Sequence, residues 1–176
     1  MPHSHAEGKE TIAEWYGQIK PSVVADIGPG AGTYANLLRP IHKGERWIAL
    51  EAWATYLSEF DLFSKYEHCI VCDVRHVDWF SIHHRPGLVI AGDMLEHLDR
   101  AEALAVIDSM KVWADNIFIS IPIIHWDQDA VNGNWYEIHR HDWTFEEMRD
   151  VLADGLKASS KGDIIGVYWW SAELCK

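Results

Sequence analysis

The sequence predicts an α/β fold: a doubly wound, mostly parallel seven-stranded sheet with an antiparallel C-terminal strand and helices on both faces. Short apolar runs alternate with segments of helical pattern along the chain. The runs are apolar on both faces, which is typical of strands buried in a parallel sheet. Strands joined by right-handed helical crossovers favour the doubly wound arrangement.

The predicted strands are the apolar runs, taken in order. The first five are Val23–Ile27, Trp47–Leu50, Cys69–Cys72, Leu88–Ala91 and Ile117–Ile121. A short run at Gly155–Ala158 and a longer one at Ile164–Trp170 flank a tight turn at 161–163. Because a tight turn joins antiparallel strands, this pair is expected to close the sheet.

Helical patterns fill the intervals between the strands. They cover Thr11–Ile19, Thr33–Leu38, Thr55–Phe63, Val77–Phe80, Ala101–Trp113 and Phe145–Leu152. Asp99 with Glu102, and Thr144 with Glu147, have the spacing of a capping box at a helix start. The irregular stretch 123–142 has no such pattern. Long irregular loops are usually functional, so we expect this one to cover a binding site.

Composition restricts the class of protein. A chain of 176 residues is expected to form a single domain, 1–176. The net charge of −12, without a cluster of Lys and Arg, argues against nucleic acid as a partner. No apolar run of about 18 residues exists for a membrane span, and the N-terminal segment lacks the apolar core of a secretory signal. We expect His3 and His5 to lie in a frayed tail.

The three cysteines do not form a disulfide framework, so we expect a cytoplasmic protein. Cys69 and Cys72 lie three apart on a predicted strand. Side chains at that spacing point to opposite faces, so a shared metal is not expected.

An acidic residue stands at or near the end of each of the first four predicted strands: Asp26, Glu51, Asp73 and Asp93. Ligands of open α/β sheets bind beyond the carboxyl ends of the strands. A single acid there would be explained as a cap for the next helix. Four in succession indicate a binding site instead.

The segment DIGPGAG, residues 26–32, indicates the kind of ligand. Its three glycines let the main chain turn tightly and approach a bound molecule. A dinucleotide-binding loop would have its third glycine at position 33, where Thr33 stands. Asp26 would also repel a pyrophosphate. A cationic or zwitterionic ligand is therefore expected.

The four acids suit an adenosine that carries an amino acid through a positive sulfur. Asp26 is placed to pair with the ammonium group, Glu51 to accept two ribose hydroxyls, and Asp73 to accept the adenine amine.

Five pieces of the chain, in this order, resemble class I (Rossmann-like) S-adenosylmethionine-dependent methyltransferases. They are VVADIGPGAGTY, WIALE, CDV, GLVIAGDMLEHLDRAEAL and NIFISIPI, and the likeness covers roughly residues 12–170. The resemblance implies S-adenosylmethionine as cofactor and methyl transfer, first of all to an oxygen of a small-molecule acceptor. Methylation of RNA or protein is the alternative, as is a non-catalytic S-adenosylmethionine-binding scaffold subunit. So small a core leaves room for a homo-oligomer in which a partner chain closes the site.

The resemblance also assigns the cofactor-binding roles, which fall on predicted strand ends and the loops that follow. The methionine part is assigned to Asp26, Gly28, Gly30 and Gly32, the ribose to Glu51, the adenine to Ala52 (with Trp53 as the alternative), Asp73 and Val74, and the sulfonium and acceptor boundary to Asp93 and Met94.

Histidines are the candidates for acid–base chemistry. His97 lies just beyond the fourth predicted strand, and His139 and His141 lie in the irregular stretch. Any of them suits a base that takes a proton from the acceptor. We expect one of His139 and His141 to face the site as base or further metal ligand. The alternative for all three is a histidine that anchors a loop.

Asp93, Glu96 and His97 are also a candidate metal site. On a helical turn, positions i, i+3 and i+4 share a face, and two carboxylates with an imidazole suit a divalent ion such as Mg²⁺. The segment is similar to the acid–x–x–Glu–His pattern of metal-assisted methyltransferases, in which the ion orients and acidifies an acceptor oxygen. Many related enzymes carry Glu-His here without a metal.

Overall fold

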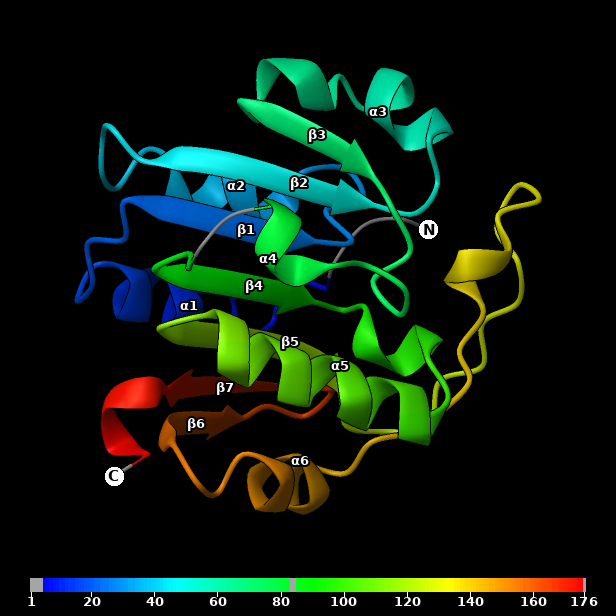
Figure 1. Cartoon of the computed structure of the whole chain (residues 1–176). Helices are drawn as coiled ribbons and strands as arrows, with labels where there is room; N and C mark the ends of the chain where they lie inside the picture. The colour runs from blue at the N-terminus through cyan, green and yellow to red at the C-terminus, as the bar shows by residue number, and fades with distance from the viewer. Residues whose placement is uncertain (1–4, 83–84, 176) are drawn as a thin grey trace.

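The computed structural model describes residues 5–82 and 85–175, and these contain one seven-stranded sheet (Figure 1). The strand order is β3-β2-β1-β4-β5-β7-β6. The strands are β1 Val23–Ile27, β2 Arg46–Glu51, β3 His68–Val71, β4 Leu88–Gly92, β5 Asn116–Pro122, β6 Leu156–Lys161 and β7 Ile165–Ser171. β1 to β5 pair in parallel, and β7 runs antiparallel to both of its neighbours. The predicted fold class is confirmed.

Helices cover both faces of the sheet. On one face lie α1 Lys9–Tyr16, α2 Thr33–Leu38 and α3 Thr55–Glu59, and on the other lie α4 Trp79–Ile82, α5 Arg100–Trp113 and α6 Phe145–Val151. Figure 1 shows α4 and α5 in front of the sheet, with α1 and α2 behind it. Four 3₁₀ turns complete the described elements: η1 Leu62–Ser64, η2 Leu95–His97, η3 Trp135–Glu137 and η4 Ala172–Leu174.

Local chemistry sets the helix boundaries. The capping box of Asp99 and Glu102 is formed at the start of α5, and the Thr144 side chain accepts a hydrogen bond from the Glu147 N–H at the start of α6. The helix predicted over Thr55–Phe63 is interrupted instead. Asp61 has a φ of +50°, which ends α3 and opens the separate turn η1.

The first helix begins earlier than predicted. It starts at Lys9, directly after Gly8 in a left-handed conformation, and ends at Tyr16 rather than Ile19. Lys9 is buried, which the charge pattern of the N-terminal segment does not suggest.

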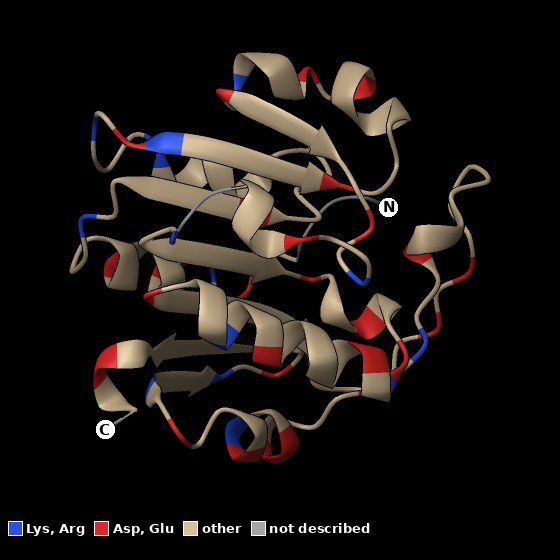
Figure 2. Ribbon diagram, in the orientation of Figure 1, with Lys and Arg blue, Asp and Glu red and all other residues tan. Residues whose placement is uncertain are grey.

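The surface agrees with the charge expected from composition. Figure 2 shows Lys and Arg scattered singly over several elements among more numerous acids. Cys69 packs against the cluster under α1, and Cys72 against the cluster under α5, so the two thiols do point to opposite faces. Within residues 5–82 and 85–175, no helix has both the length and the apolar character needed to span a bilayer.

Candidate functional site

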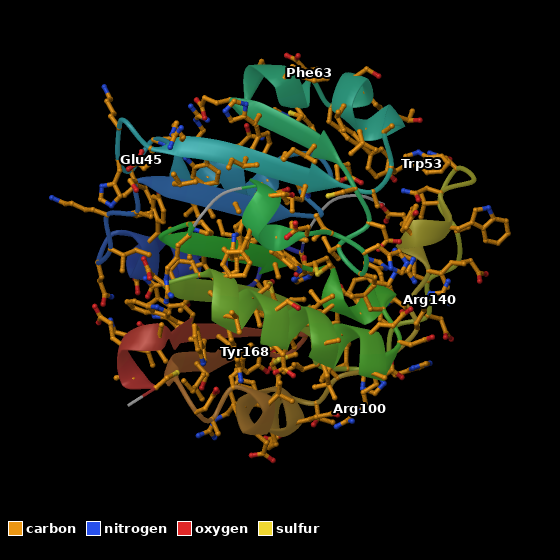
Figure 3. All side chains as sticks on the ribbon, viewed as in Figure 1. Glu45, Trp53, Phe63, Arg100, Arg140 and Tyr168 are labelled. Atoms are coloured by element: carbon orange, nitrogen blue, oxygen red, sulfur yellow. The ribbon has the colours of Figure 1, made fainter. Side chains whose placement is uncertain are left out.

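A cavity of about 430 Å³ opens at the carboxyl ends of β1, β2, β3 and β4. Its walls come from the loops that follow these strands and from a segment between Trp126 and Arg140. Figure 3 shows Trp53 and Arg140, which flank this end of the sheet, on the same side of the molecule. The position agrees with the general rule for open α/β sheets.

The glycine loop after β1 approaches the cavity with its main chain. Gly28 and Gly30 line the cavity, and both have positive φ, +61° and +51°. A Cβ added at Gly28 would lie 3.2 Å from the Cβ of Met94, so the loop packs against the segment after β4. Gly32, at φ +75°, faces the side chain of Lys65 and does not line the cavity. It serves the turn into α2 instead.

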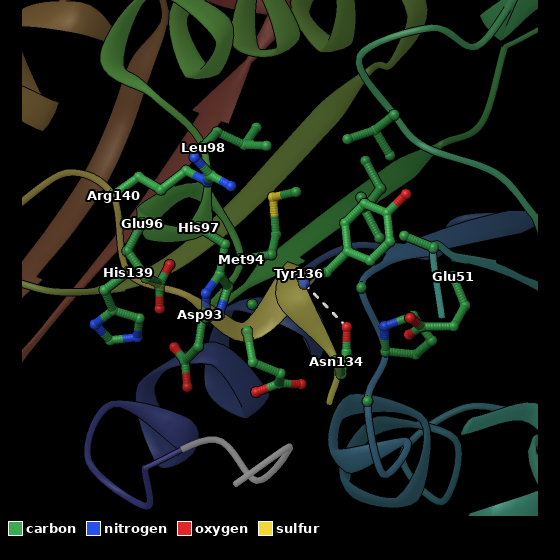
Figure 4. Close-up of a pocket in the computed structure, with 18 of the residues that line it drawn as sticks. Glu51, Asp93, Met94, Glu96, His97, Leu98, Asn134, Tyr136, His139 and Arg140 are labelled. Atoms are coloured by element: carbon green, nitrogen blue, oxygen red, sulfur yellow. Dashed lines mark hydrogen bonds between the residues drawn. The ribbon is translucent and has the colours of Figure 1, made fainter. Parts of the chain in front are cut away.

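Glu51 ends β2 and places its carboxylate at the cavity wall (Figure 4). Its Oε1 accepts a hydrogen bond from the Trp53 N–H at 2.8 Å, which orients the side chain. Burial raises the pKa of Glu51 to about 7, against the opposing effect of nearby backbone N–H groups. Ala52 lines the cavity beside it, whereas Trp53 does not.

Asp26 lies beneath the cavity and does not line it. Its Oδ2 accepts the hydroxyl of Tyr66 at 2.6 Å, and Oδ1 has no hydrogen-bond partner among the described residues. Burial raises the pKa of Asp26 to about 7. Strand alternation explains the placement, because Asp26 and its neighbour Ile27 point to opposite faces and Ile27 takes the cavity side.

Asp73 lines the cavity but already has a strong partner. Both of its oxygens accept hydrogen bonds from Arg75, whose Nη2 lies 2.6 Å from Oδ2. Arg75 also contacts Glu102 at 3.1 Å. These bonds from Arg75 lower the pKa of Asp73. A ligand amine at this wall would share Asp73 with Arg75, while Val74 lines the cavity next to them.

Asp93 and Met94 follow β4 and also line the cavity. Asp93 has a φ of +52°, and two bonds to Ser120 hold it there. Its N–H donates to the Ser120 carbonyl at 2.7 Å, and its Oδ1 accepts from the Ser120 hydroxyl at 2.6 Å. A strained non-glycine residue over-determined by its neighbours is a feature of functional sites.

Glu96, His97 and His139 form one group at the opposite wall. Single ligand atoms of the three lie within 4.8 Å of one another. The Nδ1 atoms of His97 and His139 lie 3.3 Å from the Ile138 carbonyl and 2.6 Å from the Trp126 carbonyl, respectively. A carbonyl only accepts, so in the neutral imidazoles both Nδ1 atoms carry the proton and Nε2 is the nitrogen with the lone pair.

Burial controls the charge of this group. The pKa of His97 falls to about 4, first through burial and then through the neighbouring His139, so His97 is neutral at pH 7. Burial likewise lowers the pKa of His139 and raises that of Glu96 well above its usual range. Glu96 Oε2 is buried without a hydrogen-bond partner among the described residues.

The structure does not bring Asp93 into this group. The left-handed backbone at Asp93 turns its carboxylate toward Ser120, and only Glu96 and His97 belong to the turn η2. The expected helical i, i+3, i+4 face is therefore not formed. His139 supplies the third ligand atom from a distant part of the chain.

His141 lies apart from the cavity. Its ring packs edge-on against Trp143, with ring centroids 4.7 Å apart, and its Nε2 lies 3.7 Å from a carboxylate oxygen of Glu147. Of the two loop histidines, the one that faces the cavity is His139.

The loop that carries His139 is tied down by bonds that the sequence patterns do not reveal. The Glu137 carboxylate accepts the Tyr56 hydroxyl at 2.9 Å, and the Gln128 amide donates to the Glu137 carbonyl at 2.7 Å. The Glu96 carbonyl accepts the Arg140 N–H at 2.7 Å. The contact from Tyr56 joins residues 81 positions apart, which leaves no local signal in the sequence.

Three aromatic side chains of this loop line the cavity and remain open to solvent: Trp126, Trp135 and Tyr136. The Asn134 side chain accepts the Tyr136 N–H at 3.0 Å, which fixes the turn that presents them (Figure 4). Exposed aromatics at a cavity mouth suit contact with an apolar or planar molecule.

No protein-family model and no curated protein sequence matches the chain. Among solved structures, the N-terminal domain of EvdMO1 with SAH bound aligns with a TM-score of 0.70 at 12% identity, over 96% of this chain and 82% of that one. A S-adenosylmethionine-dependent methyltransferase from Clostridium acetobutylicum aligns with a TM-score of 0.69 at 12% identity, over 93% and 89%.

Magnesium protoporphyrin IX methyltransferase from Synechocystis, with bound SAM, aligns with a TM-score of 0.64 at 15% identity, over 94% of this chain and 78% of that one. These likenesses show the fold: the chain has the architecture of class I S-adenosylmethionine-dependent methyltransferases.

Proposed function

We propose that this chain is a S-adenosylmethionine-dependent methyltransferase that acts on an oxygen of a small molecule. The observation that carries the proposal is the Glu51 carboxylate on the cavity wall beside the exposed main chain of Gly28 and Gly30. Several proteins of the same fold hold SAM or SAH in their structures. Because a fold alone does not establish an activity, the residues of the site must support the proposal.

The wall at the carboxyl ends of β1, β2 and β3 suits the methyl donor, S-adenosylmethionine. Glu51 offers a carboxylate to paired hydroxyls, Asp73 offers one to an amine, and the buried Asp26 and Glu51 both gain from a cation nearby. In each of these two, burial destabilises the ionised carboxylate, and a positive ligand reverses that effect. Asp26 Oδ1, which has no hydrogen-bond partner among the described residues, agrees with a cation bound nearby.

The wall formed by η2 and the loop suits the acceptor. His97 is neutral at pH 7 and keeps an Nε2 lone pair, so it can accept the proton of an acceptor hydroxyl. In the transfer, a C–O bond forms as the C–S bond of the sulfonium breaks. The acceptor proton passes to the imidazole, and the neutral sulfide remains. Alignment and exclusion of water supply much of the acceleration in such a displacement.

A divalent metal ion is a second proposal for the same wall. The residues fit an ion, because Glu96, His97 and His139 each offer one ligand atom and these atoms lie within 4.8 Å of one another. Two imidazoles with one carboxylate suit a transition metal better than the Mg²⁺ expected from Asp93, Glu96 and His97. A bound ion would orient and acidify the acceptor oxygen.

Calorimetry with S-adenosylmethionine, S-adenosylhomocysteine and NAD tests the donor site. We expect binding of the first two and none of NAD; uptake of NAD alone would overturn the proposal. A product assay over a pool of small hydroxylated metabolites then tests catalysis. Binding without any methylated product, from that pool or from RNA and protein, would favour a scaffold subunit.

Titration with Co²⁺ tests the metal. A visible absorption band that is lost in His139→Ala but kept in His141→Ala would support the three-residue group. Turnover unchanged by EDTA, together with no ion in elemental analysis, would remove the metal from the mechanism. The proton-transfer role predicts that His97→Ala and His139→Ala lose turnover while retaining affinity for S-adenosylhomocysteine, and wild-type rates in both would refute it.

A further inference from the structure

Lys9 is a buried cation beside the proposed donor site. It is the first residue of α1, and its side chain is only 11% exposed. Its Nζ donates to the Tyr34 hydroxyl at 2.6 Å and lies 3.8 Å from Asp93 Oδ2. Burial lowers the pKa of Lys9, and the carboxyls of Asp93, Asp26 and Glu96 oppose that effect. Burying a lysine is costly, so this position requires a reason.

The two residues before Lys9 hold this segment against β7 and the turn that precedes it. The Glu7 carboxylate accepts the N–H groups of Asp163, Ile164 and Ile165 at 2.6 to 2.9 Å, which ties this segment to the turn between β6 and β7. Gly8 has a φ of +80°, and a Cβ there would lie 2.5 Å from Val167 Cγ1. We name residues 5–9 the N-terminal strap.

The strap reaches the cavity. His5 lines it, and the His5 ring meets that of Trp126 with centroids 6.4 Å apart. His5 is therefore ordered at the site rather than part of a frayed tail, while His3 lies outside the described residues. Figure 4 shows the ribbon of the N-terminal segment beside Asp93.

Lys9 belongs to a set of polar contacts that converge on Asp93. Ser120 binds Asp93 Oδ1, and Lys9 faces Oδ2. Tyr34, which accepts from Lys9, packs its ring so closely over the end of β4 that a Cβ at Gly92 would lie 1.9 Å from Tyr34 Cε2. Contacts from α1, α2 and β5 thus fix the Asp93 carboxylate and the Lys9 ammonium just after the end of β4.

We propose that Lys9 is a positioning residue that holds the Asp93 carboxylate and, as a fixed internal cation, reduces the preference of the donor site for a charged sulfonium over a neutral sulfide. The inference rests on the proposed function. The two ligands carry the same amino-acid charges and differ by one positive charge at the sulfur, so a fixed positive charge disfavours the sulfonium relative to the sulfide. The site then binds the ground-state sulfonium less tightly. Tight binding of that state alone would not speed the transfer.

The experiment compares S-adenosylmethionine with S-adenosylhomocysteine by calorimetry. Lys9→Met keeps the apolar stem and removes the charge. The ratio of the two dissociation constants should shift by about tenfold in favour of S-adenosylmethionine, a magnitude set by one charge at partly screened distance. Lys9→Arg should stay within about twofold of wild type, and so should the exposed control Lys20→Met. A purely structural role would weaken both ligands together and leave the ratio unchanged.

Glu7→Ala provides a second route, because it releases the strap at a residue that does not itself line the cavity. It should shift the same ratio in the same direction by a smaller factor, and it carries the test if Lys9→Met does not fold. An unchanged ratio in the folded variants would overturn the role of Lys9, as would an equal shift in Lys9→Arg and Lys9→Met. A wild-type protein that binds neither compound would overturn the proposed function, and this inference with it.

Discussion

One wall of the cavity lies at the carboxyl ends of β1, β2 and β3, and its polar groups follow these strand ends. The opposite wall presents His97 from a 3₁₀ turn and His139 from a loop. We name these the strand wall and the loop wall. Glu51 is placed by sheet register opposite Val71, and the core on both faces stabilises that register. Asp73 follows the end of β3 and is held by its hydrogen bonds to Arg75. His139 lies in a loop that individual hydrogen bonds hold in place, such as the one from the Tyr56 hydroxyl to Glu137.

The two walls therefore differ in rigidity. The strand wall inherits the stability of the whole sheet, and the loop wall depends on a few local hydrogen bonds of about 1 kcal/mol each. Changes on the strand wall should therefore act on ligand affinity or global stability. Changes on the loop wall should act on local opening and acceptor chemistry.

The largest expected effect is on the strand wall, from Glu51→Ala. Two hydrogen bonds to a charged acceptor are lost, so affinity for S-adenosylhomocysteine should fall by about 100-fold at pH 8. Calorimetry measures the change, and the exposed Glu59→Ala is the matched control. Affinity within threefold of wild type would show that Glu51 does not hold the ribose.

Gly92→Ala tests the boundary between the walls. A Cβ there would lie 1.9 Å from Tyr34 Cε2, so the ring must move, and the free energy of unfolding should fall by about 2 kcal/mol. Gly17→Ala, at a φ of −61° and with only ordinary contacts, should change it by less than about 0.5 kcal/mol. Denaturant unfolding of both variants makes the comparison, and equal stability would contradict the packing described.

Below pH 7 the strand wall should bind its ligand more weakly. Burial raises the pKa of Asp26 and Glu51 to about 7, so lowering the pH protonates them, and a cationic ligand must then displace a proton. Affinity should fall by less than about tenfold for each group between pH 7 and 6, a smaller change than Glu51→Ala produces.

The stability of the unliganded protein should change in the opposite direction. Both groups have a higher pKa folded than unfolded, so the folded state binds more protons and their contribution to stability rises as the pH falls from 8 to about 6.5; below that, the lowered pKa of His97 opposes the trend. Calorimetry and unfolding at pH 8, 7 and 6 measure both trends. Glu51→Gln should remove one of the two coupled protons; a flat affinity in the wild type would contradict the assignment.

The smallest expected effect is on the loop wall. Tyr56→Phe removes the hydroxyl that binds Glu137, which costs about 1 kcal/mol and favours opening of the loop. Hydrogen exchange of residues 128–140 should quicken about fivefold while affinity for S-adenosylhomocysteine stays within twofold. The exposed Tyr136→Phe is the control, and equal exchange in all three proteins would show that the bond does not hold the loop.

The same difference explains what the sequence could reveal. Strand ends follow from local apolar runs, so the sequence alone places Glu51, Asp73 and Asp93 at one edge of the sheet. It does not show that strand alternation within β1 puts Asp26 below the cavity rather than on its wall. The group of Glu96, His97 and His139 could be only half predicted, because η2 replaces the expected helical turn.

Lys9 and Tyr56 were not predictable from local pattern. Each bonds to a residue far along the chain, and neither type of residue stands out at a helix start or within a helix. Asp73 was placed correctly at its strand end, but its pairing with the nearby Arg75 depends on side-chain geometry rather than spacing.

The bonds of Glu7 to residues 163–165 join the strap to the hairpin of β6 and β7, and β7 itself inserts between β5 and β6. During synthesis on the ribosome, the sheet from β1 to β5 can therefore assemble before Lys9 is secured. The strap can take its place beside the cavity only once that hairpin has left the exit tunnel. Until then, the edge of β5 that pairs with β7 in the folded protein is unpaired.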